Sequence, residues 1–230
     1  MARGRKRAGE TTGGGPTAPE AGHRWSQLVC LQQDLNRYFY SSDDAPEPGL
    51  LRKARIFLTT QGCWATTVYR FRRYVHLECR LPLVKGLLTV AGQVLNKAVE
   101  VGTGISIPTE TEIGPGLYIG HFGAIFLNGK VRIGSYCNIS QCNTFGLAGR
   151  GEKAGFPVVG DFVYVAPGAK VIGPVHVGSH AAIGANAVVT RDVPENGVAV
   201  GIPAKVVSLA GSGDFVRVCR RKSLLADVER

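Results

Sequence analysis

The feature that most constrains this chain is an aliphatic or aromatic residue that returns every six positions through its second half. From residue 159 to residue 189 the step of six has no exception, and it also occurs upstream from residue 107. Two irregularities interrupt it: a two-residue slip after residue 125 and a 14-residue step after residue 145. This period fits neither an amphipathic helix nor an alternating strand. The repeated positions are Ile107, Ile113, Ile119, Ile125, Leu127, Ile133, Ile139, Phe145, Val159, Val165, Val171, Val177, Ile183 and Val189.

A six-residue period predicts a parallel β-helix, in which each hexapeptide supplies one short strand and one turn. We expect three hexapeptides to form one triangular coil, with the repeated residues stacked inward, and about five coils between residues 105 and 194. A chance run of aliphatic residues in a β-sandwich is the alternative. Small residues often follow the repeated one, and we expect them to let the chain turn at the corners. These are Gly114, Gly120, Gly134, Gly160, Gly178 and Gly184.

The first hundred residues carry helical patterns instead. Four segments with apolar residues at helical spacing predict helices, and DDAPEPG at residues 43–49 marks a break between the first two. Residues 1–23 are basic and then rich in Gly, Thr and Pro, which is typical of a disordered arm. The predicted helices are 25–40, 50–58, 63–74 and 83–99. The predicted domains are 1–23 (disordered basic arm), 24–104 (α-helical), 105–208 (β-helix) and 209–230 (basic C-terminal tail with a short helix).

The net charge of +10 is concentrated at the two ends of the chain. Residues 1–104 hold 15 basic and 8 acidic side chains, whereas residues 105–210 hold 7 and 6. Basic ends suit a polyanion, but a solvated surface is the simpler interpretation, so we expect no nucleic-acid partner.

The six cysteines show no C-x-x-C spacing, and residues 1–24 contain no apolar stretch. We therefore expect a reduced, cytoplasmic protein without a signal peptide or a zinc site. The longest apolar stretch, 81–95, is interrupted by Lys85 and is too short to cross a bilayer, so we expect no integral membrane segment.

One histidine within the repeat is a candidate for chemistry. His121 lies at a predicted corner, in the string IGHFGA, and the next histidine, His176, follows about three coils later, too far to share a metal. We expect no metal. An imidazole, which ordinarily titrates at about pH 6.5, can take a proton from an alcohol and accelerate its attack by roughly 10²–10⁴. His121 is thus a candidate general base, and a surface turn histidine is the alternative.

Longer strings add a resemblance to a known family. QGCWATTVYRFRRYVH at residues 61–76, GLYIGHFGAIF at 116–126 and GVAVGIPAKVV at 197–207 resemble the hexapeptide-repeat acyltransferases. They are most similar to the serine O-acetyltransferase branch and its relatives in polysaccharide and tailoring gene clusters. The two irregular steps in the repeat also match that branch, and the resemblance covers about residues 25–208.

The resemblance implies a left-handed parallel β-helix and acetyl-CoA-dependent O-acetylation by direct transfer. The family's catalytic histidine falls on His121, and Gln141, one coil along, is a possible helper, with corner stacking as its alternative role. The family also implies a homotrimer, with pairing of trimers left open, and CoA bound in a groove between subunits. The positions that contact CoA in relatives match Ala166, Ala185, Thr190, Arg191 and Lys205.

Departures from the family pattern concern the acceptor. Serine acetyltransferases carry an orienting aspartate where this chain has Ser106, an aspartate where it has Gly120, and Arg-His-Pro where residues 155–157 read Gly-Phe-Pro. The missing polar groups suited a zwitterionic amino acid, so we expect Ser106 and Phe156 to line a site for a different alcohol. Glu110 or Glu112 would orient His121 in place of the aspartate, with turn solvation as their alternative role.

The sequence therefore predicts an O-acetyltransferase that acts on a hydroxyl of a sugar or specialised metabolite. Serine O-acetylation in cysteine biosynthesis is the first alternative. A non-catalytic β-helix scaffold that binds polyanions is the second.

Overall fold

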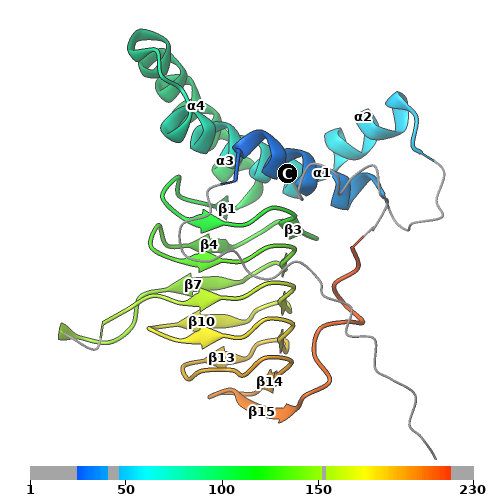
Figure 1. Ribbon diagram of the computed structural model, residues 1–230, viewed down its shortest axis with the longest axis vertical. Coiled ribbons are helices and arrows are strands. Elements are labelled where there is room, and N and C mark those ends of the chain that lie inside the picture. The colour runs from blue at the N-terminus through cyan, green and yellow to red at the C-terminus, as the bar shows by residue number, and fades with distance from the viewer. Residues whose placement is uncertain (1–24, 41–46, 152–153, 219–230) are drawn as a thin grey trace, which may run out of the picture.

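In the computed structural model, four helices sit on one end of a three-sided column of short strands (Figure 1). The structure describes residues 25–40, 47–151 and 154–218. The predicted N-terminal arm and residues 219–230 of the basic tail lie outside the described residues.

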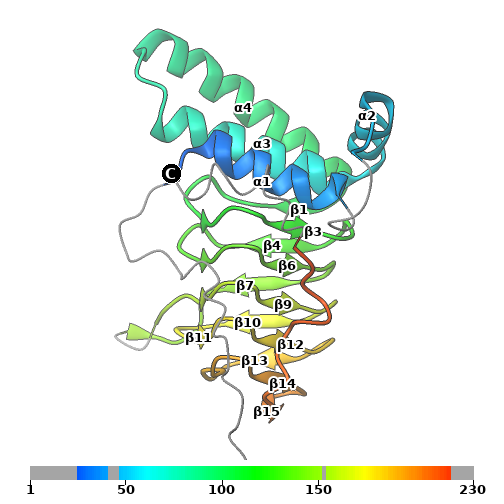
Figure 2. The same cartoon turned by 45° about the vertical axis from the view of Figure 1, so that its right-hand side comes forward.

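The helices are α1 (Gln27–Phe39), α2 (Leu50–Thr59), α3 (Gln61–Leu77) and α4 (Pro82–Thr103), close to the predicted segments. Helix α4 starts with Pro82, at a position where the backbone N–H of another residue would have no partner within the helix. Gly104 caps its C-terminal end with a φ of 67°, which glycine adopts readily. Helices α1 and α3 lie across the end of the column, and α4 packs on α3 and projects outward (Figure 2).

The column is a left-handed parallel β-helix built from three sheets, as predicted. The sheets have the strand orders β1-β4-β7-β10-β13, β11-β8-β5-β2 and β15-β14-β12-β9-β6-β3, and we call them sheets A, B and C. The strands are β1 (Ile105–Ser106), β2 (Glu112–Ile113), β3 (Tyr118–Ile119), β4 (Ile125–Leu127), β5 (Arg132–Ile133), β6 (Asn138–Ile139), β7 (Thr144–Gly146), β8 (Val158–Val159), β9 (Tyr164–Val165), β10 (Lys170–Ile172), β11 (His176–Val177), β12 (Ala182–Ile183), β13 (Val188–Val189), β14 (Val198–Val200) and β15 (Lys205–Ser208).

The six-residue repeat forms the core. Every repeated side chain from Ile107 to Val189 is buried, and none exceeds 6% exposure. Parallel register stacks equivalent residues on one another: Ile119 pairs with Ile139, which pairs with Val165. The prediction of an inward-facing aliphatic ladder is confirmed.

The glycines that follow the repeated residue act differently from the prediction. None of the six has a left-handed φ. A Cβ on Gly134 would lie 2.6 Å from the Gly160 carbonyl oxygen, and one on Gly160 would lie 2.7 Å from the Ser179 amide nitrogen. Gly134 and Gly160 therefore let consecutive coils approach each other, while non-glycine residues such as Tyr136 and Phe162 take the left-handed turns.

A buried ion pair joins the helices to the column. The Arg70 guanidinium on α3 contacts the Asp34 carboxylate on α1 at 2.7 Å, and both side chains are fully buried. Arg70 also donates to the carbonyl oxygens of Ile113 and Gly114, and Asp34 accepts from the Leu117 amide. The pair thus satisfies backbone groups at the end of the column, where no further coil exists to bond them.

The C-terminal part of the described chain folds back along the column. After the antiparallel pair β14–β15, residues 209–218 run beside sheet C (Figure 2), where Ser212 donates to the Phe162 carbonyl and Phe215 stacks on Tyr164 at 4.5 Å. We call this segment the C-terminal strap. Residues 209–218 contain no helix, and the rest of the tail, for which a linker and a short helix are expected, lies outside the described residues. Within the described part of the chain, no helix is long and apolar enough to span a membrane.

Candidate active site

His121 lies on the corner that joins sheet C to sheet A, between β3 and β4, and its side chain is exposed. This corner is longer than the one below it. Ile119 pairs with Ile139 and Phe126 pairs with Thr144, so seven residue steps here match five in the next coil. The two extra residues are the slip seen in the sequence. They make the His121 corner bulge, which explains why a residue inside a regular repeat reaches solvent.

The strand before His121 is held by helix α1. β3 is the edge strand of sheet C, and the Tyr38 hydroxyl accepts a hydrogen bond from the Ile119 amide at 2.9 Å and donates to its carbonyl at 3.3 Å. A Cβ on Gly62 of α3 would contact that same carbonyl, so a glycine is required there. The backbone two residues before His121 is therefore fixed by the helical domain.

The predicted helper, Gln141, lies on the same corner in the next coil. Gln141 also lies two residues after the paired isoleucines, and the Cys142 amide donates to the Gly123 carbonyl across the same corner. The Gln141 Oε1 atom is buried and has no hydrogen-bond partner among the described residues. An acceptor without a partner at this position can bind a donor group of an incoming molecule.

The corner continues down the column as one line of equivalent positions. The strand register aligns Gln141 with Pro167 and Pro167 with Ala185, because Ile139 pairs with Val165 and Val165 pairs with Ile183. Asn143, which is buried, ties the line together by donating to the Ala166 carbonyl at 2.8 Å. We call this line the His121 corner.

The structure brings some of the predicted CoA-contacting residues to this corner. Ala166 lies on it and is 6% exposed, and Ala185 lies on it and is exposed. Lys205 pairs with Val200 at the far end of sheet C and is exposed. Thr190 and Arg191 are also exposed. They follow β13, on the corner where the chain leaves sheet A for sheet B, so they do not share the His121 corner.

Ser106 has a partner that sequence reasoning missed. Its hydroxyl donates to Glu100 Oε1 at 2.7 Å, and Lys97 Nζ lies 2.6 Å from Glu100 Oε2. This bond to Lys97 lowers the pKa of the Glu100 carboxyl, so the group is an anion at neutral pH. Glu100 lies in a helix, and no repeat or motif marked it.

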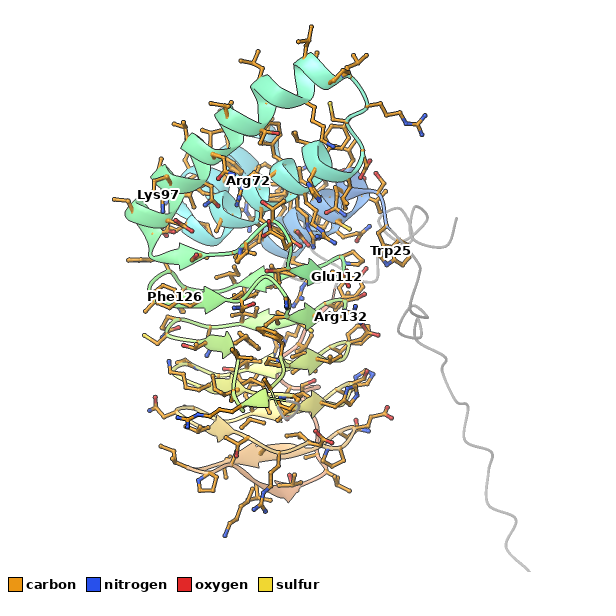
Figure 3. The ribbon with its side chains drawn as sticks, turned by 90° about the vertical axis from the view of Figure 1, so that its left-hand side faces the viewer. Trp25, Arg72, Lys97, Glu112, Phe126 and Arg132 are labelled. Carbon is orange, nitrogen blue, oxygen red and sulfur yellow. The ribbon has the colours of Figure 1, made fainter. Side chains whose placement is uncertain are left out.

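The two glutamates expected to orient His121 have other neighbours. Glu112 forms an exposed ion pair with Arg132 at 3.1 Å (Figure 3), and the Glu110 side chain lies against Gly129. Glu112 lies on sheet B itself and Glu110 on the corner between sheets A and B, so neither contact is on the His121 corner and neither supports that role.

Phe156, the predicted apolar wall for the acceptor, is partly buried and packs against the core. The Lys130 ammonium lies 5.5 Å from its ring centroid. The loop before it is closed by a bridge between Ala148 and Gly155. The described residues contain no group of three or more His, Cys, Asp or Glu side chains arranged to hold a metal.

Comparison with known proteins places this fold and site in a class. Residues 156–191 match the family model "Bacterial transferase hexapeptide (six repeats)". Together with the left-handed column and the exposed histidine at its corner, this match defines a hexapeptide-repeat acyltransferase.

The particular family follows from relatives at higher coverage. The chain is 31% identical over 175 residues to a serine acetyltransferase of Synechococcus elongatus, covering 76% of this chain and 67% of the relative. It is 32% identical over 162 residues to the serine acetyltransferase of Helicobacter pylori, covering 70% of this chain and 90% of the relative. The chain belongs to the serine acetyltransferase family.

Solved structures agree with this assignment. A serine acetyltransferase in complex with CoA is 26% identical with a TM-score of 0.62 and covers 79% of this chain and 70% of that one. Another, in complex with cysteine, is 29% identical with a TM-score of 0.62, covering 80% and 66%. The predicted fold and reaction class are confirmed.

Proposed function

We propose that this protein is an acetyl-CoA-dependent serine O-acetyltransferase with His121 as its general base. The observation that carries the proposal is the exposed His121 on a bulged corner in a chain 31–32% identical to serine acetyltransferases. This conclusion differs from the acceptor preferred on sequence grounds, which rested on three departures from the family pattern.

The reaction needs one base and one nucleophile. His121 takes the proton of the acceptor hydroxyl as its oxygen attacks the thioester carbonyl. A carbon–oxygen bond forms, the carbon–sulfur bond breaks, and the proton passes from the imidazolium to the leaving CoA thiolate. The Gln141 side chain, one coil below, supports the same site through its amide.

The His121 corner suits an extended co-substrate. Ala166 and Ala185 present small side chains along it, which permits close approach of a narrow chain. Lys205 at its far end supplies a cation for phosphate groups. Five strand steps of about 4.8 Å, from β3 to β15 in sheet C, separate the two ends, a span of about 24 Å. Thr190 and Arg191 lie beyond the corner and remain candidate contacts from the adjoining corner.

A sugar or specialised-metabolite hydroxyl is the second candidate acceptor. It is favoured by Ser106 and Gly120, which supply no charge for an amino acid's ammonium or carboxylate group. Phe156 is partly buried against the core, so it supports this candidate less strongly than its place in the sequence suggested.

An acceptor panel tests the proposal. Purified protein is incubated with acetyl-CoA and either L-serine, L-threonine or a set of sugars, and release of the CoA thiol gives kcat/KM for each. We expect L-serine to be the best acceptor. A sugar that exceeds it by tenfold or more would assign the second candidate.

The same assay tests the base. His121→Asn is expected to lower kcat by about 10²–10⁴. His176→Asn is the matched control, because His176 is also exposed but lies on β11 in sheet B. Equal activity of the two variants would contradict the role of His121.

A further inference from the structure

Helix α1 is amphipathic in the reverse of the usual sense, because its polar side faces the column and its apolar side faces away. Three of its four buried residues are polar, namely Gln27, Gln33 and Asp34. On the same side, the Arg37 guanidinium donates to the Gly116 carbonyl oxygen of the column at 2.9 Å. A surface helix normally turns its apolar side inward, so the outward apolar side of α1 calls for a partner.

The apolar side of α1 is a stripe of four large side chains. Leu28, Leu31, Leu35 and Phe39 follow each other at steps of three, four and four residues, which places them on one side of the helix. Leu28 is 60% exposed and the other three are partly exposed. Helix α2 lies beside α1 (Figures 1 and 2), but none of its residues is buried, so it covers the stripe incompletely. We call these four residues the α1 stripe.

A groove with a volume of about 340 Å³ lies between the α1 stripe and α2. All four stripe residues line it. Its polar groups gather near one end: Asn36 and Tyr40 are one turn apart at the end of α1, and the Lys53 ammonium of α2 lies 5.7 Å from the Tyr40 ring centroid. Gln32, which also lines the groove, is exposed. A groove with an apolar wall and a few polar groups at one end has the form of a small-molecule site.

A hydrogen-bond donor at the polar end lacks a partner. The Asn36 Nδ2 atom is buried and forms no hydrogen bond within the part of the chain that the structure describes. A buried donor without an acceptor is costly. A ligand that brings an oxygen atom into the groove would supply the missing acceptor.

The polar end also carries a positive charge. Among the described residues, Lys53 is the only charged one that lines the groove. Its ammonium lies 3.4 Å from Glu47 Oε1, which is long for a charge-assisted hydrogen bond, and Glu47 also accepts from the Tyr40 hydroxyl. A lysine ammonium has three donors, so Lys53 can bind a second carboxylate beside Glu47.

We propose that this groove binds an amphiphilic carboxylate of the medium-chain fatty-acid class. The hydrocarbon chain lies along the α1 stripe, and the carboxylate accepts from Asn36 Nδ2 and Lys53. The stripe then gains the apolar cover that α2 alone does not give, and the unpaired amide gains an acceptor. This site is separate from the His121 corner and goes beyond the proposed acetyl transfer.

Calorimetric titration of the full-length protein with decanoate tests the proposal, and decanol is the matched ligand without the charge. We expect decanoate to bind about tenfold more tightly than decanol. Affinity should rise about fourfold per methylene from hexanoate to decanoate. Lys53→Met should remove the preference for the carboxylate. Arg52→Met, which removes an exposed charge of the same helix outside the groove, should retain it.

The apolar wall is tested separately. Leu28→Glu places a charge in the α1 stripe and should weaken decanoate binding by about tenfold or more. Leu50→Glu is the control, at an 82% exposed position of α2 that does not line the groove, and should leave binding unchanged. Both positions are exposed, so circular dichroism should match the parent protein.

Several results would overturn the proposal. One is a dissociation constant for decanoate above about 1 mM in the parent protein, as expected if another segment of the chain or a second copy already fills the groove. Equal effects of Lys53→Met and Arg52→Met, or of Leu28→Glu and Leu50→Glu, would also reject it. Sedimentation with phosphatidylcholine–phosphatidylglycerol vesicles without decanoate binding would assign the stripe to a membrane surface instead. The titration contains neither acetyl-CoA nor an acceptor, so failure here is distinct from failure of the proposed activity.

Discussion

The Ser106 hydroxyl donates a 2.7 Å hydrogen bond to Glu100, which links the last turn of α4 to the first strand of the column. The connection between them, Gly104, lies against the corner that carries His121: a Cβ on it would be 3.1 Å from the Ala124 amide nitrogen. The chain thus holds a carboxylate next to Ser106, the position that carries the aspartate in the family pattern. Our hypothesis is that Glu100 positions this corner and stabilises the imidazolium.

Removing the charge of Glu100 tests that hypothesis. Glu100→Gln should lower kcat by up to about 10²-fold through misplacement of His121, with a smaller effect on the KM for acetyl-CoA. Adding Ser106→Asp should restore much of the loss, because a carboxylate then stands on β1 itself. Glu112→Gln is the control and should keep full activity. Equal kcat for Glu100→Gln and Glu112→Gln would reject the hypothesis.

The acid side of the stability curve provides a separate check on Glu100. Its folded-state pKa is lowered from the ordinary 4.5 by the bond to Lys97, so its stabilising effect is complete above about pH 4.5 and is lost as the pH falls below that value. The difference in urea midpoint between the parent protein and Glu100→Gln should be constant from pH 5 to 7 and shrink towards pH 3.5. A difference that grows on acidification would show that the sign is wrong.

The buried pair of Arg70 and Asp34 should be necessary for folding. Arg70→Met leaves the Asp34 carboxylate and two backbone carbonyls without their donor, and should lower the free energy of unfolding by about 3–5 kcal/mol. Replacing Asp34 by Leu in the same chain should recover part of this loss, since no lone charge then remains buried. Arg132→Met, which breaks the exposed pair with Glu112, should change it by less than about 1 kcal/mol. Urea unfolding followed by circular dichroism gives all three values.

Contact between coils should make Gly134 intolerant of a single methyl group. In Gly134→Ala the new carbon meets the backbone of the next coil, and we expect a loss of about 1–3 kcal/mol in the free energy of unfolding. Gly146→Ala is the control: its new carbon would find only Ile172 Cδ1 at 3.7 Å. A result in which both variants unfold at the same urea concentration would mean that the coils adjust freely.

Thiol labelling can report on occupation of the His121 corner. Burial raises the pKa of Cys30 to about 11 and of Cys63 and Cys137 to about 12, so these groups stay protonated and shielded at pH 8. Cys142 is exposed and lies beside Gln141. An aromatic disulfide reagent should therefore label Cys142 rather than the buried three, and acetyl-CoA should slow that labelling. The rate in a Cys142→Ser variant supplies the background, and unchanged labelling with saturating acetyl-CoA would place the co-substrate elsewhere.

The column was predictable because its period is a property of single residues. One inward side chain per hexapeptide, from Ile107 to Val189, is enough to define three-sided coils. The site was less predictable, because it depends on contacts between distant segments. Tyr38 reaches Ile119 across 81 positions, and Asp34 reaches Leu117 across 83. Neither residue differs from an ordinary helical residue when the sequence alone is considered.

The glycines show a second limit of the sequence. Their positions after the repeated residue were visible, but a turn and a close approach between coils both favour glycine. Only the φ values and neighbours of Gly134 and Gly160 separate the two causes. The Glu100–Ser106 hydrogen bond was also missed, because it depends on how tightly helix α4 connects to strand β1, and the sequence alone does not show that geometry.

The regular stacking of coils under His121 makes the column a molecular ruler. Duplicating one complete coil between Gln141 and Ala185 would keep every side chain in phase while moving Lys205 about 4.8 Å further from the imidazole. If CoA binds along the His121 corner as proposed, adding or deleting one coil should shift the preference between long and truncated thioesters.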